Sequence, residues 1–418
     1  MIKKIFIAIL FCIAGGIQAQ NGTVSPYSYF GIGELRAVET VESQMMGGLS
    51  MFADSIHVNL KNPAAYSKLA LTTYTAGFSY RNINLKSDTN TQNSSVSSLE
   101  YLSLGFKLGK GFGLGFGIMP YSSVGYSILT EKNIDGTNVR SQVSGGGGIN
   151  KVYLSVGYEI FKDVSVGVTA NYNYGTLETE IFESRENVQF DAFDRKTARI
   201  GGADFNFALN YSPLLKNSHR MFASLAVNSQ SNLVSENSQR RGSMTQTGIE
   251  IQGEDLELGL FKNTTFKIPP TTVFGLGYGK DRNWFIGAEY SFQQLSSFDS
   301  NFLGASNLSY KNASSIGIGG YIVPDYSSFS SYLKRVTYRA GAKYTKSGMV
   351  VNNEEINNLG ITFGLGLPLG GNLSNLNIGF EVGKRGTTAA SLVEENYFKI
   401  SLGLSLNDSS WFRKTKIN

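Results

Sequence analysis

The stretch from Trp284 to Phe292 alternates between apolar side chains and small or polar ones, and this period of two constrains the fold most. Successive side chains of a strand point to opposite faces, so one face of the segment is apolar. Similar segments of about 9–11 residues, the length of a membrane-spanning strand, recur between residues 72 and 407. The pattern predicts an all-β fold, an antiparallel sheet closed into a transmembrane barrel. The apolar row consists of Trp284, Ile286, Ala288, Tyr290 and Phe292.

The alternating segments number about 14, from Thr73–Arg81 at the start to Phe398–Leu406 at the end. The connections between them alternate in length. We expect long loops over Tyr121–Asn150, Thr176–Ile200 and Ser229–Pro270, with mostly short turns between these. Short periplasmic turns, long external loops and an even strand count are typical of outer-membrane barrels. The sequence therefore predicts the outer membrane of a Gram-negative bacterium as the location.

Residues 1–19 are predicted to be a secretory signal peptide. Lys3 and Lys4 precede a compact apolar run, and Ala19 stands beside the expected cleavage site. The only cysteine, Cys12, lies inside that run, so we expect no disulfide in the mature chain. No later stretch is apolar over the roughly 18 or more residues that a membrane helix needs.

Residues 20–66 do not alternate and contain many glycines and prolines, which indicates a compact irregular segment. The segment is too apolar for a solvated tail. We therefore predict that it folds into the lumen as a hatch, ahead of a barrel formed by residues 67–418; a flexible periplasmic extension is the alternative. The candidate hatch or ligand-contact residues are Tyr27, Phe30, Met45, Met46, Phe52, Asn62 and Pro63.

Several charged residues fall on the rows opposite the apolar face. Ionisable groups in a membrane protein face the interior, because lipid exposure of a charge costs several kcal/mol. They are expected to pair with one another or to anchor the hatch; alternatively, some of them line a conduction path. These residues are Arg81, Lys107, Glu159, Asp204, Glu289, Arg339, Lys343 and Glu381.

The sequence gives little support for phosphate binding, catalysis, metal binding or nucleic-acid binding. The runs of glycine at every second residue lie inside strands, unlike a phosphate loop, which joins a strand to a helix. The two histidines, His57 and His219, have no catalytic or metal-binding motif around them. The net charge of +5 is spread along the chain without a basic block, so nucleic-acid binding is not expected. We predict no enzyme activity and no cofactor.

Short motifs resemble the FadL-type family of outer-membrane proteins. Its hatch signature is similar to Gly47-Gly48-Leu49, Ala53-Asp54 and Asn62-Pro63-Ala64, although Ser55 stands where a second acid is common. Segments 25–33, 268–270 and 384–386 are similar to barrels of Bacteroidota-type bacteria, including PorV-like barrels. The resemblance implies a barrel with an N-terminal hatch. It also implies transport of fatty acids or aromatic hydrocarbons, or, for PorV-like members, service to type IX secretion.

We favour a channel for passive uptake of hydrophobic or amphipathic small molecules of the fatty-acid or aromatic-hydrocarbon class, gated by the hatch. The alternative is a non-transporting barrel, an accessory subunit of a type IX-like secretion complex or an assembly complex. The expected partners are outer-membrane lipids together with a hydrophobic small-molecule ligand or a secretion-machinery protein.

Overall fold

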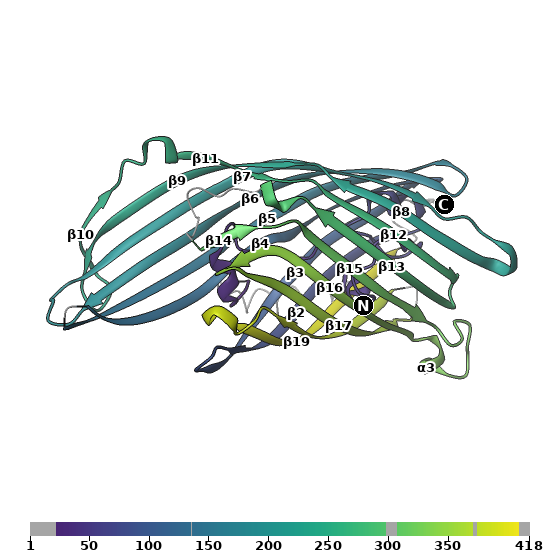
Figure 1. Cartoon of the computed structure of the whole chain (residues 1–418). Coiled ribbons are helices and arrows are strands. Elements are labelled where there is room, and N and C mark those ends of the chain that lie inside the picture. The colour runs from purple at the N-terminus through teal and green to yellow at the C-terminus, as the bar shows by residue number, and fades with distance from the viewer. Residues whose placement is uncertain (1–21, 135, 298–306, 371–373, 409–418) are drawn as a thin grey trace, which may run out of the picture.

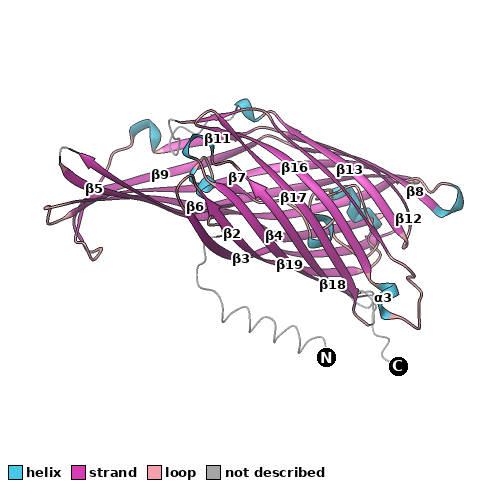
Figure 2. Ribbon diagram, turned by 60° about the horizontal axis from the view of Figure 1, so that its bottom comes forward, coloured by secondary structure: helices cyan, strands magenta, loops and turns pink. Residues whose placement is uncertain are grey.

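The computed structural model describes residues 22–134, 136–297, 307–370 and 374–408. The predicted signal peptide lies outside this range, as does the chain beyond residue 408. None of the helices in the described ranges is long and apolar enough to span a membrane. Most of the described chain forms one closed antiparallel sheet (Figures 1 and 2).

The barrel has 14 strands, which confirms the predicted fold class. It closes where β2 pairs with β19, from Thr72 opposite Asp408 to Lys86 opposite Glu394. Some barrel strands are interrupted: β8 continues as β9, β10 and β11 lead into β12, and β14 leads into β15. The strands are β2 (Thr72–Lys86), β3 (Thr91–Gly109), β4 (Phe112–Ile134), β5 (Thr137–Phe161), β6 (Val164–Arg185), β7 (Asp191–Tyr211), β8 (His219–Asn228), β9 (Ser231–Met244), β10 (Glu250–Asp255), β11 (Asn263–Ile268), β12 (Thr271–Lys280), β13 (Trp284–Gln293), β14 (Leu308–Tyr310), β15 (Ala313–Ile322), β16 (Thr337–Val351), β17 (Glu354–Pro368), β18 (Asn375–Arg385) and β19 (Glu394–Asp408).

Short helical turns and one further strand complete the described chain. Before the barrel come η1 (Pro26–Tyr29), β1 (Glu34–Leu35), α2 (Val41–Gln44) and η2 (Pro63–Lys68). Ser25, Thr40 and Asn62 each cap the turn that follows them through a side-chain oxygen. Connections within the barrel contain η3 (Lys216–Ser218), η4 (Gly259–Phe261), η5 (Leu295–Ser297), α3 (Tyr332–Arg335) and η6 (Ala389–Ser391).

The two faces of β13 are those that the alternation predicts. Ile286 is 56% exposed on the outer face, and Tyr290 and Phe292 are exposed on the same row. Phe285 and Glu289 on the other row are buried. Because the outer row is apolar and the inner row is enclosed, β13 has the arrangement of a strand between lipid and a filled lumen.

The long loops expected over Tyr121–Asn150, Thr176–Ile200 and Ser229–Pro270 are largely strand, so that part of the prediction was wrong. β4 and β5 remain paired up to Ile134 opposite Thr137, and β6 and β7 up to Glu183 opposite Ala192. Alternation is required only where one face meets lipid. Beyond the membrane neither face has to be apolar, so a polar sequence can continue the ladder without a hydrophobic period.

These extensions form one structure, which we call the external sheet: residues 121–134, 137–148, 176–200 and 231–268. Figure 1 shows it running past the rest of the barrel toward the left of the view. Small residues and breaks line up where it leaves the barrel, at Gly145–Gly148, Gly175, Gly201–Gly202 and the break at Ser229–Gln230. Because glycine has no side chain to pack, the strands can change direction at these positions.

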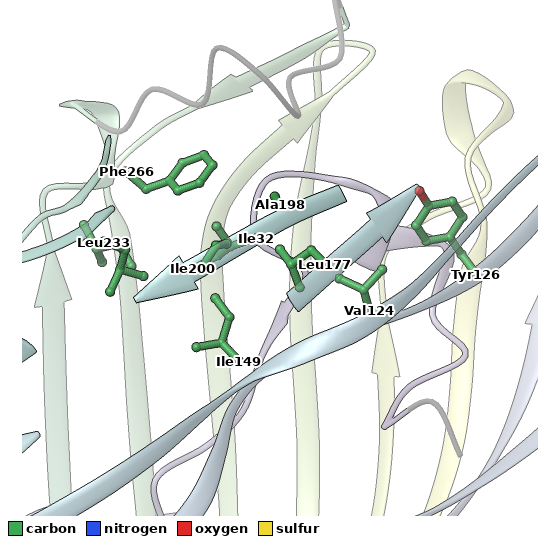
Figure 3. Packing of buried hydrophobic residues seen from close by; sticks show 10 residues of the cluster. Ile32, Val124, Tyr126, Ile149, Leu177, Ala198, Ile200, Leu233 and Phe266 are labelled. Atoms are coloured by element: carbon green, nitrogen blue, oxygen red, sulfur yellow. The ribbon is translucent and has the colours of Figure 1, made fainter. Parts of the chain in front are cut away.

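An apolar cluster packs inside the barrel next to this line (Figure 3). Ile149, Leu177 and Ile200 come from adjacent strands, and Ile32 reaches the cluster from the N-terminal part of the chain. Burial of these side chains stabilises the junction between barrel and external sheet. The cluster comprises Ile32, Val124, Tyr126, Ile149, Leu177, Ala198, Ile200, Leu233, Phe266 and Ile268.

Candidate functional site

Residues 22–71, which we call the N-terminal segment, pack against the inward faces of the barrel strands. Inward glycines leave the space that it occupies. A Cβ atom placed on Gly113 would lie 2.0 Å from the carbonyl oxygen of Tyr66, and one on Gly341 would lie 2.3 Å from the nitrogen of Gly47. One on Gly167 would lie 2.3 Å from the carbonyl carbon of Pro63. The glycine rows therefore let two backbones approach more closely than any side chain would allow.

Ion pairs and charged hydrogen bonds join the N-terminal segment to the wall at separate points. Glu34 accepts from Arg81 and Arg385, both at 3.0 Å. Lys343 pairs with Glu39 at 2.5 Å, and Lys68 pairs with Glu159 at 3.1 Å. Removing the cations beside Glu34 or Glu39 would leave a carboxylate in an enclosed site, which is strongly destabilising, whereas the Lys68–Glu159 pair is more exposed.

Glu289 and Glu381 of the wall also bind this segment. The carboxylate of Glu289 accepts from the backbone N–H of Ser50 at 2.7 Å and from its hydroxyl at 2.6 Å. Lys61 of the segment pairs with the same carboxylate. The amide of Gln44 donates to Glu381 at 3.0 Å. The segment is thus held from β13 on one side of the lumen to β18 on another.

The remaining inward charges have different surroundings. Asp204 accepts from Asn171 and Asn173 at 2.7 and 2.6 Å, within the barrel wall. Arg339 donates to Asn377 at 2.9 Å, and the same asparagine donates to Glu42 of the N-terminal segment at 2.9 Å. Lys107 is exposed near the end of β3, because its row leaves the enclosed part of the lumen there.

The electrostatics of the N-terminal segment depend on these cations. Burial opposes ionisation of Glu34, yet Arg81 and Arg385 hold the pKa of its carboxyl well below the usual range. Burial likewise opposes ionisation of Glu39, and Lys343 nevertheless lowers the pKa of that carboxyl. Both carboxylates are therefore charged at neutral pH and bind the wall as anions.

The N-terminal segment also fills a parting in the barrel wall. β3 and β4 stay paired only as far as Leu102 opposite Ile118. Beyond that point β1 pairs with β4 instead, with Glu34 opposite Ser123. Arg36 forms an ion pair of 2.9 Å with Glu100 on β3. Residues 34–36 thus bridge the two strands where they separate.

The predicted hatch residues are distributed over several places rather than gathered in one pocket. Tyr27 and Phe30 belong to a cluster with Val351 and Ile356, and the Tyr27 hydroxyl donates to the carbonyl of Val393 at 2.6 Å. Met45 fills the space beside Gly364 and Gly379, and Met46 packs beside Gly319. Phe52 contacts the rings of Phe222, Phe285 and Tyr321. Asn62 donates to Asn210 at 2.7 Å, and Pro63 begins η2 against Gly167.

A cavity of about 450 Å³ lies beneath the N-terminal segment, at the end of the barrel with the short turns. By the pattern of outer-membrane barrels this is the periplasmic end. Nδ1 of His57 lies 2.6 Å from Asp54, and Nε2 lies 3.8 Å from Glu42. Burial disfavours the imidazolium, but Asp54 raises the pKa of His57 above its ordinary value. The lining residues include Met46, Phe52, Asp54, His57, Arg339 and Asn375.

This cavity is lined by both polar and apolar side chains. Among the residues that the structure describes, no group of three or more His, Cys, Asp or Glu side chains could hold a metal ion. His219, the other histidine, stacks on Tyr278 with ring centroids 5.4 Å apart.

Sequence reasoning missed the partners of the inward charges. Glu34, Arg36 and Glu39 were not singled out, although each lies in the segment predicted to enter the lumen. A buried charge needs an opposite charge nearby. The inward cations Arg81 and Lys343 were therefore a signal that acidic residues of the N-terminal segment would meet them.

Several known structures have a similar fold. The toluene transporter TbuX of Ralstonia pickettii superposes with a TM-score of 0.59 at 14% identity, covering 90% of this chain and 98% of that one. The toluene transporter TodX of P. putida gives 0.59 at 14%, covering 90% and 99%. A FadL homologue of Pseudomonas aeruginosa gives 0.57 at 11%, covering 89% and 98%. At such identities the likeness establishes the fold.

The comparison with protein-family models gives a family. The model of a protein family described as BamG matches residues 1–418, the whole chain. A search of curated proteins finds no match.

Proposed function

The chain belongs to the BamG family, and we propose that it acts as a non-transporting outer-membrane barrel, an accessory subunit of a secretion or assembly complex. In this role residues 22–66 are a fixed plug rather than a moving gate. The observation that carries the proposal is the attachment of the N-terminal segment to the wall by ion pairs on several strands.

Gating would require the N-terminal segment to leave these contacts. Separating one partner of a buried ion pair costs about 3–5 kcal/mol, and several pairs would have to separate together. A ligand shifts a protein between two conformations when the free energies of these conformations differ by only a few kcal/mol. The glycine contacts add a second restraint, because they leave no space in which the backbone of the segment could slide. A plug held in this way suits a barrel whose working surfaces are outside its lumen.

A double-cysteine variant tests whether the plug has to move. The hydroxyls of Ser67 in η2 and Ser165 on β6 are 2.8 Å apart, so Ser67→Cys with Ser165→Cys places two thiols together. The sequence has one other cysteine, Cys12, in the predicted signal peptide. We expect the oxidised variant to replace the native protein fully in cells. The Ser67→Cys single variant is the control.

Loss of function in the oxidised form, restored by a reductant, would contradict the fixed plug. That result would favour the second candidate function, uptake of a hydrophobic small molecule through the lumen. The specific observation in its favour is the parting between β3 and β4, which lies beside the apolar cluster containing Val124 and Tyr126. Similarity to structures described as toluene transporters supports it as well. Uptake of labelled oleate or toluene by cells carrying the oxidised and reduced variants measures it directly.

A further inference from the structure

One edge of β4 is open along the external sheet. β4 is paired with β5 over its whole length, from Phe112 opposite Tyr158 to Ile134 opposite Thr137. On its other edge it pairs with β3 only up to Ile118, and then with β1 at Ser122 and Ser123. Among the described residues no strand continues this edge from Tyr126 to Ile134. Figure 1 shows the β4–β5 hairpin extending well past the end of the β2–β3 hairpin.

The backbone groups that point to this open edge can be assigned. The carbonyl of Tyr121 accepts from Arg36 at 2.9 Å, and the N–H of Gly125 donates to the hydroxyl of Ser28 at 3.1 Å. Both contacts are made by the N-terminal segment, on the side away from β5. Backbone groups of a strand alternate in direction with a period of two. The residues that present their N–H and C=O groups to the edge are therefore Ser127, Leu129, Glu131 and Asn133.

The sequence of this edge lacks the usual protection against pairing. Natural edge strands are blunted by charges, prolines or bulges. From Tyr126 to Thr130 the edge carries no charge and no proline, and Ile128 and Leu129 are exposed. Charges appear only toward the tip, at Glu131 and Lys132. The stretch is rich in residues that favour strands, and it continues the edge on which β1 already pairs.

We propose that the edge of β4 from Tyr126 to Asn133 is a docking site for an extended strand of a partner polypeptide, added antiparallel beside β4 above β1. This inference rests on the proposed accessory function and identifies its contact surface. Only an extended backbone matches a row of alternating donors and acceptors. An uncharged stretch of that strand would lie opposite Tyr126–Thr130.

The β4 strand of a second copy does not fit beside the same edge. Two copies in one membrane are related by a twofold axis along the membrane normal. Both β4 strands would then run outward from the membrane, whereas antiparallel pairing requires the two strands to run in opposite directions. The strand that pairs here is therefore not β4 of a second copy, and we assign it to a different polypeptide.

Hydrogen exchange at single-residue resolution tests the site. The barrel is extracted from native outer membranes in mild detergent with its bound proteins, and compared with the same chain refolded alone. In the isolated barrel, the amides of Ser127, Leu129, Glu131 and Asn133 should exchange rapidly. The alternate amides, bonded to β5, should be protected. In the native preparation all of them should be protected, the first set by on the order of 100-fold.

Two variants at one position make the test specific to the backbone. Leu129→Pro removes an N–H directed to the open edge, and Leu129→Ala removes the side chain but keeps that N–H. We expect the partner to be lost from the proline variant alone. Protection of the amides bonded to β5 in both variants shows that the β4–β5 hairpin is intact.

The failures of the two proposals are distinguishable. Rapid exchange of the edge amides in a preparation that retains a stoichiometric protein partner overturns the docking site and leaves the accessory function standing. So does equal retention of that partner by the proline and alanine variants. A native preparation that contains this barrel and no other polypeptide overturns the accessory function and the docking site together.

Discussion

Lys343 on β16 and Glu39 in the N-terminal segment form an ion pair of 2.5 Å across 304 residues of sequence. Glu39 is nearly buried, with 7% of its side chain exposed. The pair connects the part of the chain without alternation to the barrel that surrounds it. It is one of several contacts through which the sequence of the lumen wall determines the position of the N-terminal segment.

Removing Lys343 should release the segment. In Lys343→Met the Glu39 carboxylate stays enclosed without its cation, so we expect a loss of about 3–5 kcal/mol. Replacing both residues by methionine should recover most of that loss, because no unpaired charge remains. Protease cleavage within residues 22–71, together with urea unfolding in micelles, measures both effects. Equal destabilisation by the single and double variants would show that the pair contributes through packing alone.

The glycine rows should also be sensitive to substitution. Gly341→Val directs a branched side chain at the backbone of Gly47, and overpacking of this kind costs about 1–3 kcal/mol or more. The adjacent Ala340 is exposed on the outer face, so Ala340→Val is the matched control and should be nearly neutral. Thermal unfolding of the two variants, followed by heat-modifiable gel mobility, distinguishes them. A tolerated Gly341→Val would mean that the segment is loosely seated.

The outer row of β13 predicts a lipid-facing residue. Ile286→Arg should destabilise the barrel by about 2–4 kcal/mol if the residue lies near the midplane, because it places a charge in hydrocarbon. Ile286→Leu should change little. Equilibrium unfolding in lipid vesicles provides the measurement. Wild-type stability of the arginine variant would place Ile286 outside the hydrocarbon region.

The His57–Asp54 pair predicts a pH dependence at the periplasmic cavity. The pKa of His57 is raised above its ordinary 6.5, so its stabilising contribution is complete below that pH and is lost as the pH rises through the folded-state pKa. The pKa of Asp54 is lowered from 3.8, so its contribution is present above that value and is lost as the pH falls through the lower folded-state pKa.

Amide exchange of Ile56 and His57, whose N–H groups donate to Asp54 at 3.0 and 2.8 Å, reports on this loop. After correction for intrinsic base catalysis, their protection should fall at alkaline pH in the native chain. It should not do so in His57→Gln. An identical pH profile in the two proteins would show that the ion pair does not hold the loop.

The barrel could be predicted from sequence because a membrane imposes a strict pattern. Ile286 and Phe285 lie on opposite faces of β13. Ile286 belongs to the apolar row, which can face lipid, whereas Phe285 shares its row with Glu289, whose charge cannot face lipid. The external sheet could not be predicted in this way. At Glu131 or Glu180 neither face of the strand has to be apolar, so the ladder continues with no period to detect.

The individual contacts that hold the N-terminal segment could not be predicted from the sequence either. Its turns follow from Ser25, Thr40 and Asn62, which are local capping signals. Its place in the lumen depends on contacts such as Glu34 with Arg385, which are 351 residues apart. Periodicity carries no information on such pairs. The rule that a buried charge needs an opposite charge limits the residues that could pair with each inward charge, but it does not identify the pair.

The central claim, that this barrel works as part of a complex with its lumen closed, is tested most directly by native extraction. The protein is taken from outer membranes in mild detergent and analysed by mass spectrometry for bound proteins and lipids together. We expect a stoichiometric protein partner and no small molecule retained in the lumen. A stoichiometric fatty acid or hydrocarbon, with no protein partner, would contradict the account and identify the barrel as an uptake channel.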